Sequence, residues 1–409
     1  MKATPLAGAR VFIVLLNAPY WGSERHMVTL AAALTRLGAE VRVAVCDWEF
    51  GGIRKALEGC GVPYDEIDVS GKFTRQGGPV YLLRMLKRCQ ATAAAVKLAM
   101  RRFDATHIVI PDETNFLYAV PALLGRGRTR SLFVPANVPD AARRDTGVAY
   151  RAFWQRLIAR LSDEIVANSE YTAAVIGRLL PQRERIPVVP CALPVRQEND
   201  RDPVVDEVDA ARTNLVYIGQ VAAHKGVALL IEAAAEVMHE RSDVDLVVAG
   251  SMTSALFQTK LKEQVERHGL TGRIQFIGEV RDVPGLLRKA FLHIAPSLCE
   301  ESFGLTVIEA KAQGVPSVVF PSGALTETVH HAVDGYCCRA CTVPELVDGL
   351  RYFLDASDRR QAAAARARQS AADYTSAAVE GRWREVFEQG LVRPRSEDAD
   401  ARLRLSPQA

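Results

Sequence analysis

Two glutamates, Glu301 and Glu309, stand with seven residues between them in the segment from Pro296 to Val329. They flank a polar turn, Ser302-Phe303-Gly304, and the helix expected to follow it. The start of a helix offers backbone N–H groups and the positive end of the helix dipole, which both attract an anion. A phosphate held there would have a carboxylate near each end of the molecule that carries it, an arrangement that suits a nucleotide-sugar. The alternative is that both glutamates only complement the helix dipole.

A lysine occupies a comparable position earlier in the chain. Gly219 follows an expected strand, and Lys225-Gly226 stands at the head of the next helix. A glycine lets a ligand approach the backbone, and a lysine there supplies a mobile positive charge for a diphosphate. Alone, the pattern fits a solvent-exposed lysine equally well. It gains weight because the Glu301 turn comes at another strand end of the same expected sheet.

The composition is that of a globular protein. The 409 residues are 48% hydrophobic and 24% charged, and they suffice for two or three domains. No apolar run reaches about 18 residues, and the short apolar stretch near the N-terminus favours a first buried strand over a signal peptide. Residues 1–200 hold 27 Lys and Arg against 19 Asp and Glu, a net charge of +8 that suggests an anionic partner for that half.

The eight cysteines are scattered along the chain, which favours reduced thiols in a cytoplasmic protein. Cys338 and Cys341 form a C-x-x-C pair, but no second pair of ligands stands at a spacing suited to zinc. The sequence therefore predicts no metal site.

Strand and helix patterns alternate through the first half of the chain. An apolar strand at Val11–Leu16, a helix at Glu24–Leu37 and a second strand at Val41–Val45 form a βαβ unit, which predicts a parallel sheet. Further strands are expected at His107–Ile110, Ser131–Val134, Glu164–Ala167 and Ile186–Val189.

The alternation is interrupted at Pro194–Thr213, a charged segment that reads as a linker, and then restarts. The strands expected after it are Leu215–Ile218, Asp245–Ala249, Ile274–Ile277, Leu292–Ala295 and Ser317–Phe320. The intervening helices are expected at Val227–Val237, Leu261–Arg267, Val283–Ala290 and Thr306–Gln313.

The predicted fold class is α/β, with two Rossmann-like, doubly wound domains that face each other across a cleft. The expected divisions are an N-terminal acceptor-binding domain, a linker, a donor domain, a closing helix and a disordered tail, at residues 1–193, 194–213, 214–375, 376–390 and 391–409.

Four segments carry a resemblance to a known family: YIGQVAAHKGVALLIEAAAEV, LVVAGS, IQFIGEV and PSLCEESFGLTVIEAKAQGVPSVV. They resemble the donor domain of the retaining glycosyltransferases of family 4, which have the two-domain GT-B architecture. The family's E-x7-E motif is matched by Glu301 and Glu309. The resemblance spans about Val11–Gln389, and at its N-terminus GSERHMVTLAAALTRLGAEVRV is similar to the family's glycine loop and first helix.

The resemblance implies a hexosyltransferase with a set of donor-binding residues. Glu309 would hold the ribose hydroxyls, Glu301 would contact the transferred sugar, and Lys225 would neutralise the leaving diphosphate without a metal. Catalysis would rest on Glu301 and Lys225. The other donor-binding positions implied are the backbone of Ser302, Phe303, Gly304 and Leu305 at the phosphate and sugar, Gly22 over the phosphates, Val280 beside the base, and Gly219 with Gln220 after the first donor-domain strand.

Several positions depart from the family's pattern. Gln220 stands where an arginine is usual, so one phosphate-binding cation is missing. Asn137 follows Ala136 where many members place a histidine near the acceptor. Cys191-Ala192 replaces the usual Asn-Gly, and Gly323-Ala324 replaces paired glycines before a retained acid, Glu327.

Three polar residues of the first half have competing interpretations. Asn115, after an expected strand end, could face the acceptor, as could Asn137. His26, on the first helix, is more simply a solvated or packing residue. His107 opens a strand and is more simply a hydrogen-bonded histidine of the core or of a sheet edge.

Residues Lys72–Arg102 place basic side chains among apolar ones. Such a surface could lie on anionic lipid at the inner face of the cell membrane, as in family members that act on lipid-linked acceptors. The alternative is ordinary surface helices. Nucleic acid is not expected as a partner, because no aromatic residues interleave with the basic ones.

The sequence thus predicts an enzyme that moves a sugar from a nucleotide-diphosphate sugar to a glycan, lipid-linked or small-molecule acceptor, with no cofactor. Gln220 and Asn137 keep open a non-catalytic, sugar-nucleotide-binding homologue that acts through a partner protein. A sugar-nucleotide epimerase is disfavoured, because the Glu301 turn resembles that of the transferases.

Overall fold

The structure is a computed structural model that describes residues 6–16, 20–47, 52–69, 79–125, 127–142, 147–194, 202–252 and 254–388. The chain divides into two compact units. Unit 1 comprises residues 1–168, 173–192 and 379–409, and unit 2 comprises residues 169–172 and 193–378. Each unit contains one six-stranded parallel sheet among its described residues.

The sheet of unit 1 has the strand order β3-β2-β1-β4-β5-β6. Its strand β1 is buried from Val11 to Leu15 because helices cover both faces of the sheet, as the continuous apolar run VFIVL predicts. The order reverses direction between β1 and β4, as in doubly wound sheets. The strands are β1 (Arg10–Leu15), β2 (Glu40–Cys46), β3 (Tyr64–Ile67), β4 (His107–Ile110), β5 (Arg130–Phe133) and β6 (Glu164–Ile165).

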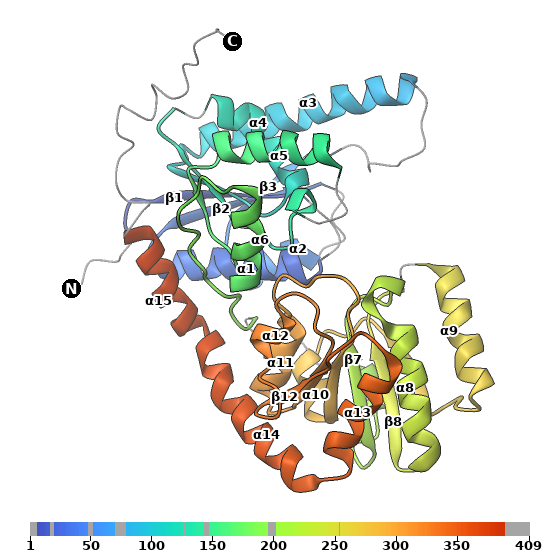
Figure 1. Ribbon diagram of the computed structural model, residues 1–409. Helices are drawn as coiled ribbons and strands as arrows, with labels where there is room; N and C mark the ends of the chain where they lie inside the picture. The colour runs from blue at the N-terminus through green and yellow to red at the C-terminus, as the bar shows by residue number, and fades with distance from the viewer. Residues whose placement is uncertain are drawn as a thin grey trace. The chain divides into compact units, whose positions relative to one another are not determined.

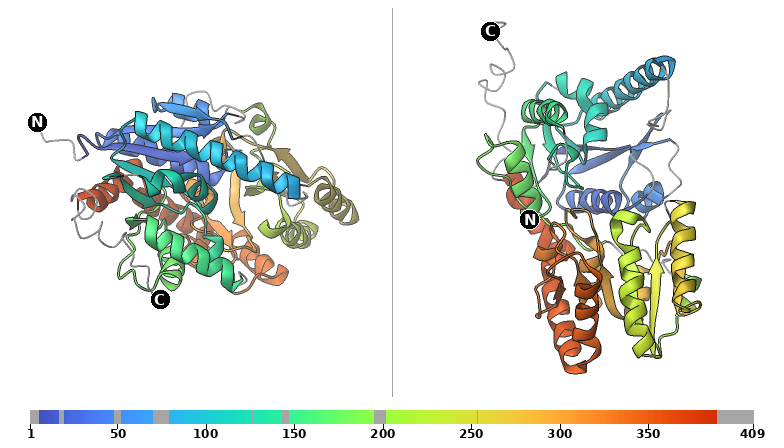
Figure 2. Two further views of the ribbon diagram at one scale, coloured as in Figure 1. Left: turned by 90° about the horizontal axis from the view of Figure 1, so that it is seen from above. Right: turned by 45° about the vertical axis from the view of Figure 1, so that its right-hand side comes forward.

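Helices cover the two faces of this sheet (Figure 1). One face packs on α1, α2 and the C-terminal helix α15, and the other on α3, α4, α5 and α6. The long helix α3 stands out in light blue in both figures of the ribbon (Figures 1 and 2). The bounds are α1 (Gly22–Arg36), α2 (Gly52–Gly59), α3 (Pro79–Arg102), α4 (Glu113–Leu124), α5 (Val148–Leu161), α6 (Glu170–Leu179) and α15 (Ser376–Val386), with a short 3-10 turn at Asp140–Ala142.

The sheet of unit 2 has the strand order β12-β11-β10-β7-β8-β9. All its strand pairs are parallel, so their carboxyl ends lie at one edge, where ligands of doubly wound sheets bind. The strands are β7 (Thr213–Ile218), β8 (Val244–Ala249), β9 (Ile274–Gly278), β10 (Ala290–Ala295), β11 (Ser317–Val319) and β12 (Gly335–Cys337).

Unit 2 is also covered on both faces. The helices α8, α9 and α13 pack on one face, and α7, α10 and α11 on the other. The bounds are α7 (Pro203–Asp206), α8 (Val227–Glu240), α9 (Ala255–Arg267), α10 (Val283–Arg288), α11 (Leu305–Ala312), α12 (Leu325–Thr328), α13 (Val343–Leu354) and α14 (Ser357–Ser370), with 3-10 turns at Ala223–Lys225 and Ala371–Tyr374.

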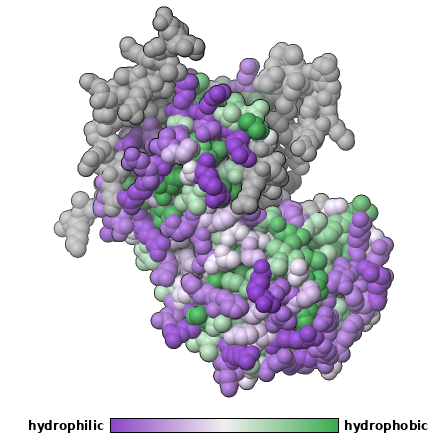
Figure 3. All heavy atoms as spheres, in the orientation of Figure 1, coloured by the Kyte–Doolittle hydropathy of each residue, from purple (hydrophilic) through white to green (hydrophobic). Residues whose placement is uncertain are grey.

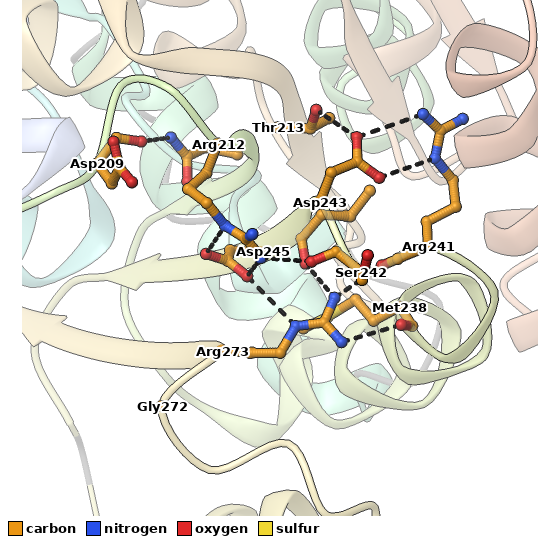
Figure 4. A network of polar contacts seen from close by, with 12 residues as sticks. Asp209, Arg212, Thr213, Met238, Arg241, Ser242, Asp243, Asp245, Gly272 and Arg273 are labelled. Atoms are coloured by element: carbon orange, nitrogen blue, oxygen red, sulfur yellow. Dashed lines mark hydrogen bonds and ion pairs between the residues drawn. The ribbon is translucent and has the colours of Figure 1, made fainter.

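An ion-pair network fixes the amino ends of β7 and β8, away from the carboxyl edge (Figure 4). Arg212 donates to both carboxylate oxygens of Asp245, at 2.8 and 2.6 Å. Arg273 reaches the same carboxylate at 3.4 Å and donates to the carbonyls of Met238, Arg241 and Val244. The guanidinium groups thereby satisfy carbonyls at a helix end and a strand start, and the network belongs to the framework of unit 2.

Most of the expected elements are confirmed within one to three residues at each end, and α8 and β9 begin at the expected residues. Helix α9 starts at Ala255, earlier than the expected Leu261. The strand expected at Ile186–Val189 is wrong. That segment forms a single bridge, between Ala167 and Val188, because Pro187 and Pro190 lack the N–H groups that a ladder needs.

The segment read as a linker is not featureless. It contains α7, whose Val205 is buried, and the Lys289 ammonium donates to the carbonyls of Val205, Asp206 and Val208 at 2.7, 3.1 and 2.7 Å. Its residues 195–201 and the tail expected to be disordered, 391–409, lie outside the described residues.

The surface mixes polar and apolar side chains. In the face shown in Figure 3, hydrophilic side chains dominate the described surface and apolar patches lie among them. Among the described helices, none has both the length and the apolar character required to cross a bilayer.

Candidate functional site

Two loops meet at the carboxyl edge of the unit 2 sheet. The loop after β7 carries Gly219, Gln220 and Lys225, and the loop after β10 carries the Glu301 turn. The backbone N–H groups of Leu298 and Cys299 both donate to the carbonyl of His224, at 2.9 and 3.2 Å. The sheet order places β7 and β10 side by side, which is why two loops 76 residues apart in sequence come together.

Lys225 and Glu301 form an ion pair at this junction. The Lys225 Nζ donates to Glu301 Oε1 at 2.6 Å, and about a quarter of each side chain is exposed, 25% and 24%. Burial disfavours the charged ammonium, but the neighbouring Glu301 carboxylate and Cys299 thiol outweigh it and raise the pKa of Lys225. The lysine is therefore charged at neutral pH, within reach of an anion that enters the edge from solvent.

The turn after Glu301 leads directly into α11. Gly304 has a φ of +99°, and a Cβ there would lie 2.7 Å from Leu325 Cδ2, so this position requires glycine. Phe303 is buried and its ring packs edge-on against Tyr374 at 5.7 Å. The N–H groups at the start of α11, including that of Leu305, precede the helix's own acceptors and give this end its attraction for anions.

Glu309 lies on α11 and is 5% exposed. The residue two positions later, Lys311, is fully buried and donates to Asp334 Oδ2 at 2.6 Å and to Ser370 Oγ at 3.2 Å. His330 donates its backbone N–H to Asp334 Oδ1 at 2.8 Å, and its ring lies 2.9 Å from Asp334 Oδ2. This cluster anchors the helix that carries Glu309.

We expect Asp334→Ala to lower the free energy of unfolding of unit 2 by about 3–5 kcal/mol, because it leaves the buried Lys311 ammonium without its counter-charge. Burial opposes ionisation of Asp334, but hydrogen bonds from His330 and Lys311 prevail and lower its pKa. The stability that the carboxylate contributes is thus present above about pH 4 and is lost as the pH falls through the lowered pKa. Chemical denaturation measures the effect, with the exposed Asp348→Ala as the control, expected within about 0.5 kcal/mol of wild type.

Gly323 completes the surroundings of the Glu301 turn. Its backbone bridges to Glu301, and the following residue, Ala324, donates its N–H to the Glu301 carbonyl at 2.9 Å. A Cβ at Gly323 would lie 2.3 Å from that carbonyl oxygen. The Gly323-Ala324 sequence, a departure from the family's paired glycines, therefore keeps a glycine where an added Cβ would clash with the backbone of Glu301.

The remaining donor-side candidates are distributed over both units. Gln220 accepts a hydrogen bond from Tyr217 Oη on its carbonyl at 2.7 Å, and Val280 follows β9 and packs against the core under α10. Gly22 is the first residue of α1 in unit 1, where the Glu24 carboxylate accepts from the N–H of Trp21 at 3.1 Å and from Ser23 Oγ at 2.8 Å. The roles implied for Gly22, Gln220 and Val280 stay predictions.

The expectation that Asn115 faces the acceptor is wrong for this structure. Asn115 is fully buried. Its Oδ1 accepts from the N–H of Leu16 at 2.8 Å, and its Nδ2 donates to Asp112 Oδ2 at 2.6 Å. The side-chain amide ties the end of β1 to the start of α4. Asn137 is exposed after β5, and its acceptor role stays a prediction.

The two histidines are core residues. His26 is 3% exposed, so it packs in the interior and is not solvated, and burial lowers its pKa to about 4. His107 is buried at the start of β4, where its Nδ1 lies 2.8 Å from Thr106 Oγ1 and its ring contacts Phe387. The interpretation of His107 as a hydrogen-bonded core histidine is confirmed.

Sequence reasoning missed a group of residues that contact the Glu301 turn. Ser169 and Thr172 donate their hydroxyls to the carbonyl of Ser302, at 2.7 and 3.2 Å. Glu327 accepts the N–H groups of Glu170 and Tyr171. The local signal was Ser169 directly before the helix of residues 170–179, since serine is a preferred N-cap residue.

Comparison with known proteins identifies both halves of the chain. Residues 21–197 match the family model described as Glycosyltransferase Family 4, and residues 200–370 match the one described as Glycosyl transferases group 1. The two matches meet at residues 197–200 and together cover most of both units.

The chain is also similar to individual proteins. It is 30% identical over 275 residues to the lipopolysaccharide core biosynthesis mannosyltransferase LpsB of Rhizobium meliloti, a match that covers 64% of this chain and 73% of that protein. HepE of Anabaena, solved with UDP and glucose, has a TM-score of 0.77 at 16% identity, covering 93% of this chain and 100% of HepE.

WaaG, a glycosyltransferase involved in lipopolysaccharide biosynthesis, has a TM-score of 0.69 at 19% identity, covering 92% and 99% of the two chains. At such identities the two solved structures establish the fold, a pair of Rossmann-like domains of the GT-B type. With the family matches and the LpsB similarity, the conclusion is that this chain belongs to the family 4 (group 1) glycosyltransferases.

Proposed function

We propose that this glycosyltransferase moves a hexosyl group from a nucleoside-diphosphate sugar to a hydroxyl of a glycan or lipid-linked acceptor, with retention of the anomeric configuration. The names of its relatives support the two substrate classes: LpsB is a mannosyltransferase of lipopolysaccharide core biosynthesis, and HepE was solved with UDP and glucose. Polysaccharide or glycoconjugate biosynthesis is the corresponding setting.

The observation that carries the proposal is the Lys225–Glu301 ion pair beside the start of α11. One charge-bearing group of each sign, 2.6 Å apart, faces the edge of the sheet next to a helix N-terminus. The leaving diphosphate would lie against the Lys225 ammonium and the N–H groups of Gly304 and Leu305. Glu301 would accept from sugar hydroxyls, and Glu309 from the ribose.

The proposed transfer takes place on one face of the sugar. The acceptor oxygen forms its bond to the anomeric carbon on the side from which the diphosphate departs. The bond between that carbon and the diphosphate oxygen breaks, and its electron pair stays on the oxygen. The acceptor proton passes to the departing phosphate, so no protein base is needed. The fixed charges of Lys225 and the α11 terminus stabilise the negative charge that develops on the leaving group.

Product analysis tests this function directly. Wild-type protein is incubated with α-anomeric UDP-, GDP-, ADP- and dTDP-sugars and a panel of glycan and lipid-linked acceptors, and the products are followed by proton NMR. The proposal requires transfer from one nucleotide class and an α-linked product. A β-linked product would refute retention. The absence of both hydrolysis and transfer with every donor would refute the function itself and favour the non-catalytic alternative.

We expect transfer to continue in a chelator, because Lys225 and the helix N-terminus supply the positive charge that a divalent cation would otherwise provide. Initial rates measured before and after dialysis against EDTA should agree within about twofold. A loss of more than about tenfold that Mg²⁺ or Mn²⁺ restores would assign the charge stabilisation to a metal.

The proposed lipid contact concerns the basic segment 72–102 of unit 1. Residues 72–78 lie outside the described residues, and α3 begins at Pro79. The last turn of α3 carries Arg101 and Arg102, and Leu98 is 49% exposed. Cosedimentation with anionic and neutral vesicles tests the contact: binding to anionic vesicles alone, weakened by salt, supports it, and no binding to either refutes it.

A further inference from the structure

The Glu301 turn is held by a short segment far from it in sequence. The carbonyl of Ser302 accepts two hydrogen bonds, from Ser169 Oγ at 2.7 Å and from Thr172 Oγ1 at 3.2 Å. Both hydroxyl groups are buried, so they share this acceptor away from water. Ser302 directly precedes Phe303 and Gly304, and its position therefore sets the path of the backbone into α11.

The two hydroxyls are themselves fixed. Ser169 caps α6, because its Oγ accepts the N–H of Thr172 at 3.0 Å while it donates to Ser302. Thr172 belongs to the first turn of the same helix. A shift of the α6 terminus would therefore move both donors together.

Glu327 fixes that terminus from the other side. Its Oε2 accepts the N–H of Glu170 at 3.0 Å and its Oε1 the N–H of Tyr171. Together with the hydrogen bond from the Thr172 N–H to Ser169 Oγ, these contacts satisfy the N–H groups of the first three residues of α6. The carboxylate also lies at the positive end of the α6 dipole, where a negative charge is stabilised.

The contacts close into a ring. Glu327 stands three residues after Ala324, whose N–H donates to the carbonyl of Glu301 at 2.9 Å. From Glu301 the chain passes to Ser302, from Ser302 two hydrogen bonds lead to α6, and from α6 two more lead back to Glu327. The part of the α6 region that takes part, residues 169–172, belongs to unit 2 together with residues 301–327, whereas the rest of α6 belongs to unit 1.

We infer that Ser169, Thr172 and Glu327 are positioning residues for the sugar donor. They form a clasp, defined by these three side chains, that sets where the Glu301 carboxylate and the N–H groups of Gly304 and Leu305 stand relative to a donor. None of the three contacts the donor in this account; each acts through the backbone of residues 301–304. The inference rests on the proposed function, since the donor it positions is the nucleoside-diphosphate sugar.

Two variants open the clasp without touching the turn. Ser169→Ala combined with Thr172→Val removes both donors to Ser302, and Glu327→Gln weakens the hold on α6. We expect both variants to raise the donor KM and to lower kcat, so that kcat/KM for the donor falls by about 10- to 100-fold. The acceptor KM should be unchanged. Thr172→Ser keeps the hydroxyl and should restore near wild-type kinetics in the presence of Ser169.

A matched control separates positioning from capping. Ser254 caps α9 in the same way, with its Oγ accepting the N–H of Phe257 at 3.3 Å. Ser254→Ala should lower the melting temperature by a few degrees, about as much as the clasp variants do, yet leave the donor KM and kcat unchanged.

Hydrogen exchange provides a second readout that needs no turnover. In ligand-free protein, the peptide that spans residues 302–310 should exchange faster in the clasp variants than in wild type, and Ser254→Ala should leave it unchanged. The inference is overturned if wild type turns over and the clasp variants have the same donor KM and the same exchange rate as wild type. Wild type without turnover would refute the proposed function instead, and the exchange rates would still decide whether the clasp holds the turn.

Discussion

Lys225→Met is expected to reduce kcat/KM for transfer by about 100- to 1,000-fold, the loss typical for removing one preorganised electrostatic group from a transition state. The substitution removes the ammonium that stands 2.6 Å from Glu301. It also leaves the Glu301 carboxylate without its cation, so a negative group would then face the diphosphate. The loss should fall on both the donor KM and kcat, because the ammonium faces a diphosphate that is already charged in the bound donor and gains further negative charge as its bond to the sugar breaks.

Steady-state kinetics with saturating acceptor measure this loss, and Lys262→Met on the exposed side of α9 is the control, with expected parameters within about twofold of wild type. Because the Glu301 carboxylate and the Cys299 thiol outweigh burial and raise the pKa of Lys225, the lysine stays charged at neutral pH and should contribute no inflection to the pH–rate profile between about pH 7 and 9. A Lys225→Met variant with wild-type kcat/KM would show that another group neutralises the leaving diphosphate.

Gly323→Ala is expected to lower kcat/KM by about 100-fold although residue 323 bears no functional group. Gly323 has a φ of +60°, and a Cβ there would lie 2.3 Å from the carbonyl oxygen and 2.8 Å from the nitrogen of Glu301. Neither atom is at the end of a flexible side chain. The backbone of Glu301 itself must move, and its carboxylate moves with it away from Lys225.

The structure offers a matched glycine for comparison. At Gly381 in α15 a Cβ would meet no atom within 4 Å, so Gly381→Ala should leave the kinetics unchanged and slightly stabilise the helix, by about 0.4–1 kcal/mol. Transfer assays and thermal denaturation of both variants supply the comparison. Equal activity of Gly323→Ala and wild type would mean that the Glu301 backbone need not stand where the structure has it.

The sequence was a good guide to the sheets for a simple physical reason. Central strands of a doubly wound sheet are buried on both faces, so they appear as short apolar runs that end at glycine or polar turns, as in β7 and Gly219. The same reasoning failed at Ile186–Val189, where the run is equally apolar but Pro187 removes an N–H group from the ladder. Apolar composition alone does not show which backbone groups are free to pair.

The residues of the candidate site could be proposed from the sequence, but the contacts between them could not. The positions of Glu301, Glu309 and Lys225 followed from the family resemblance, and helix starts could be read from local patterns. The contact of Lys225 with Glu301 depends on β7 and β10 being neighbours in the sheet, which no local pattern gives. For Asn115, the position after a strand suggested a side chain that faces the acceptor. In the structure its amide is buried inside unit 1, where it accepts from the N–H of Leu16 and donates to Asp112.

Long-range polar contacts were the least predictable feature. Ser169 and Thr172 stand 133 and 130 residues before Ser302, and Glu327 stands 157 residues after Glu170. Each could be assigned locally, as a cap or as a surface acid, but not to the turn that it supports. Their spacing on a helix start is visible in sequence, and their target is set only by the tertiary fold.

The most direct test of the central claim, that the carboxyl edge of unit 2 binds a nucleoside-diphosphate sugar through Lys225, is a thermal-shift measurement. Wild type, Lys225→Met and Lys262→Met are heated with UDP-, GDP-, ADP- and dTDP-sugars. At a ligand concentration about 100 times Kd, wild type and Lys262→Met should gain about 2.7 kcal/mol of stability from one nucleotide class, and Lys225→Met should gain far less. No shift in wild type with any donor, or an equal shift in all three proteins, would contradict the account.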